Sequence, residues 1–166
     1  MKYVLILSDT HSNYDILQDV LDSNILADVI IHLGDNYDDL DQCVYNRRDR
    51  EVYRVPGIFH PNYRDGSLAR QLEITIEGKN FLIAHALDDI HGFADVILYG
   101  HTHNWEISNS INGVCFNPGH LRAPVDKRRI ATYGQMEIRD TGITLKILNL
   151  QHKVIVEFRQ EYSTRL

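Results

Sequence analysis

Cysteine is scarce in this chain, since its 166 residues include two, Cys43 and Cys115. Two cysteines build no disulfide framework, and they suit a reducing compartment, where we expect them to be simple filler of the core or surface. No apolar run reaches the roughly 18 residues that a membrane-spanning helix needs. The apolar run after Met1 has the length of a strand rather than of a signal-peptide core. These absences predict a cytoplasmic protein that does not cross a membrane.

An excess of positive charge is also lacking. Lys and Arg number 17 against 23 Asp and Glu, which gives a net charge of −6. A protein that coats nucleic acid needs the opposite balance. The charge therefore argues against such a partner, although it does not exclude a nuclease, whose metal ions would supply local positive charge.

Three common enzyme signatures are missing from the sequence. The loop G-x-x-x-x-G-K-[ST] of enzymes that use nucleoside triphosphates does not occur, and neither does the dinucleotide-binding G-x-G-x-x-G. The G-x-S-x-G turn of serine hydrolases is absent as well. These absences argue against all three enzyme classes.

The sequence does contain four buried-looking strands that each finish on carboxylate or imidazole side chains. The apolar runs lie at residues 3–7, 29–33, 81–84 and 96–99. The side chains that follow them are Asp9, His11, Asp35, His85, His101 and His103. In open α/β sheets, ligands bind beyond the carboxyl ends of the strands. We therefore expect these six side chains to meet at one edge of the fold.

This ligand set favours a catalytic metal site. Imidazoles and carboxylates with no cysteine among them disfavour a structural zinc site. Six ligands are too many for one catalytic metal but suit two divalent metals about 3.5–4 Å apart with one shared carboxylate. We expect Asp35 to be the bridge, because Gly34 before it lets the backbone approach a cofactor. The ligand chemistry suits Mn, Ni, Fe, Zn or Co better than Mg, and we expect Mn.

The order of elements predicts one α/β domain over residues 1–166. A strand at 3–7, a helix with apolar positions at 16, 17, 20 and 21, and a strand at 29–33 form a β-α-β start. An acidic segment at 37–46 predicts a short helix, and 51–55 a third strand. The second half alternates apolar and polar residues and turns at Asn112-Gly113 and at 140–142, which indicates antiparallel hairpins. Two sheets packed face to face with helices outside would bury both sets of strands.

His32 lies inside the second strand rather than at its end. A histidine at such a position is more often a hydrogen-bonded member of the core than a metal ligand. We therefore expect His32 to be structural.

The ligand motifs also have a distinctive order along the chain. They are Asp9-x-His11, Gly34-Asp35, His85 and Gly100-His101-x-His103. Together with the Asn-Pro-Gly turn at 117–119, this order closely resembles the calcineurin-like metallophosphoesterases, and among them the small single-domain archaeal and bacterial phosphodiesterases. The resemblance extends from Met1 to about Gly119. It implies a four-layer αββα sandwich with two mixed β-sheets.

The resemblance also implies a ligand assignment and an activity. The first metal would be held by Asp9, His11, Asp35 and His103, and the second by Asp35, His85 and His101. A hydroxide that bridges the metals would attack phosphorus in line, and the metals would neutralise the equatorial oxygens. The expected activity is that of a phosphodiesterase or phosphatase acting on a small phosphate ester.

One motif departs from the family pattern. After the third strand the family usually has Gly-Asn-His or Gly-Asn-Cys, in which Asn binds the second metal and the next residue can protonate the leaving group. Here Gly57 is followed by Ile58 and Phe59, which can do neither. A distorted loop could bring His60 or Asn62 into the site; alternatively, the second metal is weakly held. We expect His60, or a water, to act as the general acid.

Three further side chains are candidates for contact with substrate. Arg64 lies on the loop at 58–65 that departs from the family pattern, here called the variant loop, and Arg122 follows the Asn-Pro-Gly turn. Each offers a bidentate fork to a phosphate, although either could be a solvated surface arginine. His120 follows the same turn, where the family often has Ser, and it could face the site.

A second function hypothesis is a binding scaffold that keeps the fold and hydrolyses little. The family includes members that have lost ligands and act in assemblies, and the missing Asn-His pair supports this hypothesis. The six retained ligand positions argue against it, because a scaffold has no physical need for them. The antiparallel C-terminal strands could present an edge to a second copy, which is compatible with a homo-oligomer.

Overall fold

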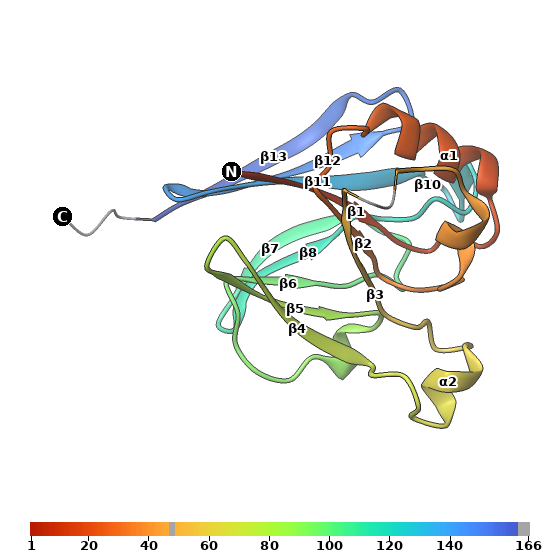
Figure 1. Ribbon diagram of the computed structural model, residues 1–166, viewed down its shortest axis with the longest axis horizontal. Coiled ribbons are helices and arrows are strands. Elements are labelled where there is room, and N and C mark those ends of the chain that lie inside the picture. Colours follow the sequence, from red (N-terminus) through yellow and green to blue (C-terminus); the bar gives the residue numbers. More distant parts are fainter. Residues whose placement is uncertain (47–48, 163–166) are drawn as a thin grey trace.

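The computed structural model describes residues 1–46 and 49–162, and its two large β-sheets lie face to face (Figure 1). The first sheet contains β1 (Lys2–Leu7), β2 (Val29–His32), β3 (Glu51–Arg54), β11 (Thr132–Arg139), β12 (Gly142–Asn149) and β13 (Val154–Glu161). Their order across the sheet is β13-β12-β11-β1-β2-β3. β1, β2 and β3 pair in parallel, as the β-α-β start predicts, whereas β11 to β13 pair antiparallel.

The second sheet contains β4 (Gln71–Ile76), β5 (Lys79–Ala84), β6 (Val96–Leu98), β7 (Glu106–Ser110) and β8 (Gly113–Asn117). Their order is β4-β5-β6-β8-β7, with parallel pairing of β5, β6 and β8 and antiparallel edges. Both sheets are therefore mixed, and the predicted architecture is confirmed. A short ladder of β9 (Val125–Asp126) and β10 (Arg129–Ile130) stands beside them and was not predicted.

Helix α1 (Tyr14–Ser23) covers the outer face of the first sheet (Figure 1). The Asn13 side chain caps it by accepting a hydrogen bond from the backbone N–H of Ile16 at 3.3 Å. Its buried positions are Leu17, Val20 and Leu21, which share a cluster with Leu5 and Leu7 of β1. No helix in the described ranges has the length and apolar content required to span a bilayer.

The remaining helical elements are short: η1 (Asp39–Gln42) and η2 (Leu87–Asp89) are 3₁₀ turns, and α2 (Pro61–Arg64) is a single α-helical turn. The acidic helix predicted at 37–46 is therefore only the turn η1. The outer layer on the second sheet is η2 with its flanking loop. This layer is thin because residues 85–95, which connect β5 to β6, are fewer than a crossover helix usually needs.

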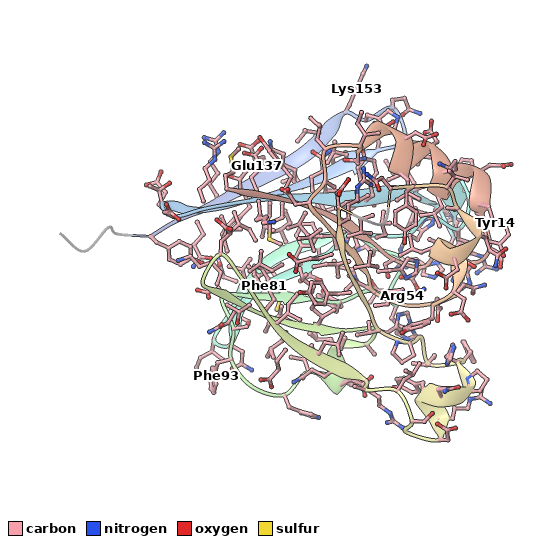
Figure 2. All side chains as sticks on the ribbon, in the orientation of Figure 1. Tyr14, Arg54, Phe81, Phe93, Glu137 and Lys153 are labelled. Carbon is pink, nitrogen blue, oxygen red and sulfur yellow. The ribbon has the colours of Figure 1, made fainter. Side chains whose placement is uncertain are left out.

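The core lies between the two sheets. Successive side chains of a strand point to opposite faces, so Ile6 of β1 joins the inter-sheet cluster while its neighbour Leu7 packs toward α1. From the second sheet, Phe81 and Phe116 fill the same space and are fully buried. Figure 2 shows Phe81 between the sheets, whereas Phe93 points away from the molecule.

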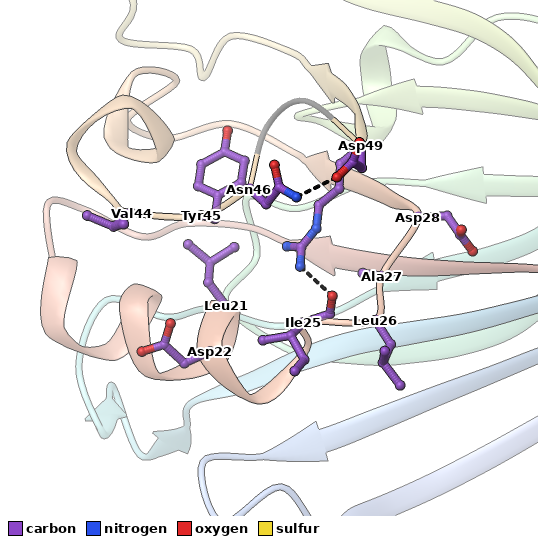
Figure 3. Close-up of a pocket in the computed structure, with 11 residues that line it drawn as sticks. Leu21, Asp22, Ile25, Leu26, Ala27, Asp28, Val44, Tyr45, Asn46 and Asp49 are labelled. Carbon is purple, nitrogen blue, oxygen red and sulfur yellow. Dashed lines mark hydrogen bonds between the residues drawn. The ribbon is translucent and has the colours of Figure 1, made fainter.

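A hollow of about 420 Å³ lies beside the C-terminal end of α1 (Figure 3). Arg50 lines it and donates a hydrogen bond to the Ile25 carbonyl at 2.6 Å. None of its described lining residues is a histidine, and it shares none of them with the cavity beside the ligand histidines. The chemistry predicted from the sequence therefore lies elsewhere.

Candidate metal centre

The carboxyl ends of two parallel strand pairs meet at one edge of the sandwich. β1 and β2 end before Asp9 and Asp35, while β5 and β6 end before His85 and the turn at 100–103. Backbone hydrogen bonds join the ends within each sheet, from Asp9 N–H to the Gly34 carbonyl and from Gly100 N–H to the His85 carbonyl, both at 2.9 Å. The predicted convergence of strand ends is thus present in the structure.

Four of the six predicted ligands form a compact cluster. Asp9, His11, Asp35 and His103 each offer one ligand atom, and these atoms all lie within 4.8 Å of one another. The Nε2 atom of His103 is 3.2 Å from Asp9 Oδ1 and 3.2 Å from His11 Nε2. His11 Nε2 is in turn 3.5 Å from Asp35 Oδ2. This is the same set that the family resemblance implies for the first metal.

The other two predicted ligands lie on the far side of Asp35. His85 Nε2 is 3.4 Å from Asp35 Oδ1, the oxygen that does not face His11. The His85 and His101 rings stand edge to face with their centroids 5.1 Å apart. One carboxylate therefore lies between two groups of imidazoles, the placement that a bridging ligand requires.

Two buried atoms of this site are poorly partnered within the described residues. His85 Nε2 makes no hydrogen bond, and Asp9 Oδ1 has only the 3.2 Å contact with His103 Nε2. His85 Nδ1 lies 2.7 Å from the Leu33 carbonyl, so Nδ1 carries the hydrogen and Nε2 presents a lone pair. An unsatisfied buried polar atom costs about 1–3 kcal/mol. Divalent cations on the two sides of Asp35 would satisfy these atoms, and the donor set therefore fits metal ions.

The ligand loops have an unusual backbone. Left-handed φ values, which bulky side chains rarely adopt, occur at Asp9, His11, Asp35, His101 and His103, with φ between 47° and 69°. Each such residue costs on the order of 1–3 kcal/mol, and strain of this kind clusters at ligand clamps. The fold therefore stores strain in these loops, as expected of a functional site.

Two glycines let the loops approach the carboxylates. A Cβ atom on Gly57 would overlap Asp35 Oδ1, and one on Gly100 would overlap the Ser8 hydroxyl. That hydroxyl donates to Asp9 Oδ2 at 2.5 Å. Any side chain at Gly57 or Gly100 would therefore displace the neighbouring carboxylate, Asp35 or Asp9.

Burial and ion pairing act in opposite directions at the Asp9–His103 pair. Burial alone would raise the pKa of Asp9, but the hydrogen bonds with His103 and Ser8 and the charge of His85 outweigh it and hold that pKa below its ordinary value. The hydrogen bond to Asp9 raises the pKa of His103 despite burial, and Asp126 adds to this effect. Burial lowers the pKa of His11, which favours the neutral, ligating imidazole.

The structure adds Asp126, a functional residue that the sequence reasoning missed. Its Oδ2 lies 2.7 Å from His103 Nδ1, which leaves Nε2 of that ring for the cluster. Metal-binding histidines usually direct their second ring nitrogen at such a carboxylate. That rule signals that a partner should exist, but Asp126 lies 23 residues further along the chain, so the sequence alone does not single it out.

The four remaining candidates lie outside the cluster. His60 lines a cavity of about 680 Å³ that also borders His11 and Asp35, and its Nδ1 accepts a hydrogen bond from Asn62 N–H at 3.2 Å. The guanidinium of Arg64 lies 5.9 Å from the Phe59 ring centroid and does not line that cavity.

Arg122 and His120 lie on the opposite side of the site, near His11 and His103. Arg122 lines a shallow hollow of about 310 Å³ together with His11, and its Nη1 is 4.0 Å from Asp126. His120 is fully buried, and its ring stacks on His103 with centroids 5.2 Å apart. In this structure His120 therefore supports His103 and has no exposed surface of its own.

Comparison with known proteins agrees with this fold. The similar solved structures include the following three, each at 18% identity, a level that shows the fold alone. YfcE, a phosphoesterase from E. coli, has a TM-score of 0.70 over 94% of this chain and 98% of its own. A predicted phosphoesterase from Streptococcus pneumoniae TIGR4 has 0.69 over 97% and 98%. Vps29 from Entamoeba histolytica, solved in complex with Zn²⁺, has 0.63 over 97% and 99%.

Sequence comparison gives a more direct assignment. A search of curated proteins finds no match to the chain. The family described as "Calcineurin-like phosphoesterase superfamily domain", however, matches residues 1–141. That match covers the β-α-β start, both groups of ligands and Asp126. The chain therefore belongs to the calcineurin-like phosphoesterase superfamily.

Proposed function

We propose that the protein hydrolyses a phosphate ester, as a phosphodiesterase or phosphatase, at a site for two divalent metals. The observation that carries this proposal is the position of Asp35. One of its carboxylate oxygens faces His11 and the other faces His85, whose Nε2 has no partner among the described residues. Backbone strain and unpaired buried atoms both destabilise the folded protein. A purely structural role gives no reason to keep either feature.

The residues divide between the two metals as follows. Asp9, His11, Asp35 and His103 would hold the first, and Asp35, His85 and His101 the second. When bound, such metals supply Lewis acidity and a nucleophile near neutral pH. Mn is the metal we expect, with Ni, Fe, Zn and Co as alternatives, because the ligands are imidazoles and carboxylates.

The protein itself orients the ligands. Asp9 Oδ2 accepts hydrogen bonds from the Ser8 hydroxyl and from His101 N–H, at 2.5 and 3.0 Å, which turns Oδ1 toward the cluster. Arg122 lies beside His11 and could bind two phosphate oxygens with its planar fork. Arg64 stands further out, beside Phe59, where it could meet only a distal part of the substrate.

His60 is the candidate general acid. Because Nδ1 accepts a hydrogen bond from Asn62 N–H, the ring hydrogen of the neutral imidazole is on Nε2. The ring borders the cavity next to His11 and Asp35. In its imidazolium form it would donate the Nε2 proton to a departing oxygen, which leaves a neutral imidazole. General acids of this kind contribute about 10²–10⁴-fold to rate.

Metal content and turnover test the proposal together. The protein is reconstituted with Mn, its metal per chain is measured by elemental analysis, and p-nitrophenyl and bis-p-nitrophenyl phosphate are used as substrates. We expect two metals and turnover on at least one ester. Asp35→Asn should lose both, whereas the exposed matched control Asp140→Asn should retain both. A fully loaded protein that hydrolyses neither ester contradicts the proposal.

The role of His60 has a separate test. His60 is also the N-cap of α2, so His60→Asn retains a capping side chain but removes the acid. We expect turnover to fall roughly 100-fold with unchanged metal content. The exposed His91→Asn is the matched control. Unchanged turnover in His60→Asn rules out His60 as the acid.

A binding scaffold is the second candidate function. The loop after β3 favours it, because Ile58 and Phe59 can neither bind a metal nor carry a proton. One metal or none per chain, with no turnover on either ester, is the result that this function predicts. The open strand edges at β13 and β4 could then pair with a partner or a second copy.

We also propose that the protein acts in the cytoplasm. Cys43 and Cys115 are both buried, and they are the only two cysteines in the sequence. Two cysteines build no disulfide framework, which is typical of a protein from a reducing compartment.

A further inference from the structure

We propose that the cavity beside the metal centre binds a planar, uncharged aromatic group of the substrate, with Phe59 as its stacking surface. This inference rests on the proposed function, because the aromatic group would belong to the ester whose phosphate reaches the metals. It names the substrate class: an organic phosphate whose ester group carries a flat ring with N–H donors, such as a nucleoside.

The cavity is continuous with the metal centre. Its volume is about 680 Å³, and its walls include His11, a ligand candidate for the first metal, and Asp35, the proposed bridging carboxylate. A phosphate held at the metals would therefore direct one ester group into this space. The volume is in the range of sites that hold small organic ligands.

Aromatic side chains form the outer walls. Tyr14, Tyr37 and Phe59 line the cavity together with the His60 ring. Phe59 is 69% exposed and Tyr14 is 41% exposed, so both have ring surface available to a ligand. An aromatic surface exposed beside a phosphate site offers a face on which a base can stack.

The Tyr37 ring forms one wall of the cavity and is held in position by neighbouring side chains. The guanidinium of Arg54 lies 4.7 Å from its ring centroid, and the His60 ring lies 5.5 Å away. Arg54 is itself anchored to Asp41 at 2.9 Å. The position of the Tyr37 ring is thus set by the protein before any ligand binds, which lowers the entropic cost of binding.

The charge of the cavity selects against a second anionic group. Among its described lining residues there is no Lys or Arg, whereas Asp38 and Asp39 are present. Asp39 is buried and accepts hydrogen bonds from Thr10 and from Ser12 N–H, at 2.6 and 2.7 Å. Asp38 is exposed, so its carboxylate can accept hydrogen bonds from the N–H groups of a ring. A second phosphate group, such as that of a polyphosphate chain, would be repelled here.

This proposal assigns a function to the variant loop. The two residues after Gly57 supply no ligand and no proton, but the second of them, Phe59, supplies the most exposed aromatic ring of the cavity. The loop that departs from the family pattern would therefore determine substrate specificity.

Direct binding tests the proposal without hydrolysis. The probes are the methylene phosphonate analogues of adenosine 5′-phosphate and ribose 5-phosphate, which share one phosphonate and cannot be hydrolysed. Calorimetry on the Mn-loaded protein gives the ratio of their dissociation constants. Stacking of one base is expected to favour the adenosine analogue roughly 5- to 150-fold.

Variants assign that preference to Phe59. Phe59→Ala should reduce the ratio to nearly one, and Phe59→Trp should restore it. Phe93→Ala is the matched control, because Phe93 is 77% exposed and does not line the cavity. A wild-type ratio near one, or a ratio that survives in Phe59→Ala, overturns the inference. Because no turnover is measured, a clear base preference in a protein that hydrolyses no ester would instead contradict only the proposed hydrolysis.

Discussion

His32 is a fully buried histidine that takes no part in the cluster. Its Nδ1 accepts a hydrogen bond from Gly34 N–H at 3.3 Å, so the ring hydrogen is on Nε2, which lies 3.2 Å from the Thr10 hydroxyl. That hydroxyl donates to Asp39 at 2.6 Å. The prediction of a structural core histidine is confirmed, and its hydrogen bonds tie β2 to the loop that carries the first ligands.

The neutral state of His32 makes stability depend on pH. Burial lowers the pKa of His32 from 6.5 to about 4. Between these values the unfolded chain binds a proton and the folded protein does not, so stability is present above pH 6.5 and is lost as pH falls toward 4. The loss is on the order of 3 kcal/mol.

Urea denaturation with chelator present, at pH 7 and pH 5, measures this effect. The difference in unfolding free energy between the two pH values should shrink in His32→Gln and persist in the exposed control His91→Gln. Equal pH dependence in the wild type and His32→Gln would show that His32 is not responsible.

At the scale of elements, the β9–β10 hairpin connects to the metal centre. Lys127 and Arg128 form its turn with φ of 48° and 69°, the left-handed pair typical of a two-residue hairpin turn. Before the turn, Asp126 holds His103, and after it Arg129 donates to the Thr102 carbonyl. Strands this short have no periodic signal, so the sequence did not predict them.

This hairpin should therefore control metal affinity. Asp126→Ala removes the acceptor that orients His103, and second-layer changes of this kind weaken metal binding about 10- to 100-fold. Competition with a chromogenic chelator measures the dissociation constant, with Asp140→Ala as the exposed control. The melting temperature of the metal-free protein should change little. Equal affinities in both variants would contradict a positioning role for Asp126.

At the scale of the whole molecule, the ligands come from both sheets. Asp9, His11 and Asp35 follow strands of the first sheet, whereas His85, His101 and His103 follow strands of the second. A metal held by both groups would link the sheets at one edge, where the inter-sheet apolar core ends. Binding to the folded state alone then adds to global stability.

We therefore expect metal to raise the melting temperature. At a free metal concentration of about 100 times the dissociation constant, the gain is about 2.7 kcal/mol. For a chain of this size, that corresponds to roughly 5–11 °C. Differential scanning fluorimetry with Mn and with EDTA measures the shift, which Asp35→Asn should abolish and Asp140→Asn should keep. An identical melting temperature in Mn and EDTA would argue against a bound metal.

The sequence by itself determined the elements whose signals are local. The alternation in β4 and the β-α-β start each depend on neighbouring residues, and each was predicted in place. The hairpin predicted to turn at Asn112-Gly113 is present, but its turn is Ile111-Asn112, and Gly113 begins β8 opposite Ser110. The ligand candidates were also readable, because Asp9, Asp35 and His85 stand directly beyond apolar strands.

Only the tertiary structure decided which side chains meet. His11 and His103 face each other across 92 residues of sequence, and Asp126 reaches His103 across 23. His120 lies beneath His103 instead of at the mouth of the site, and His60 caps α2 beside a cavity instead of joining the ligands. These outcomes depend on how two sheets pack and on where loops of fixed length can reach, and no local pattern encodes either.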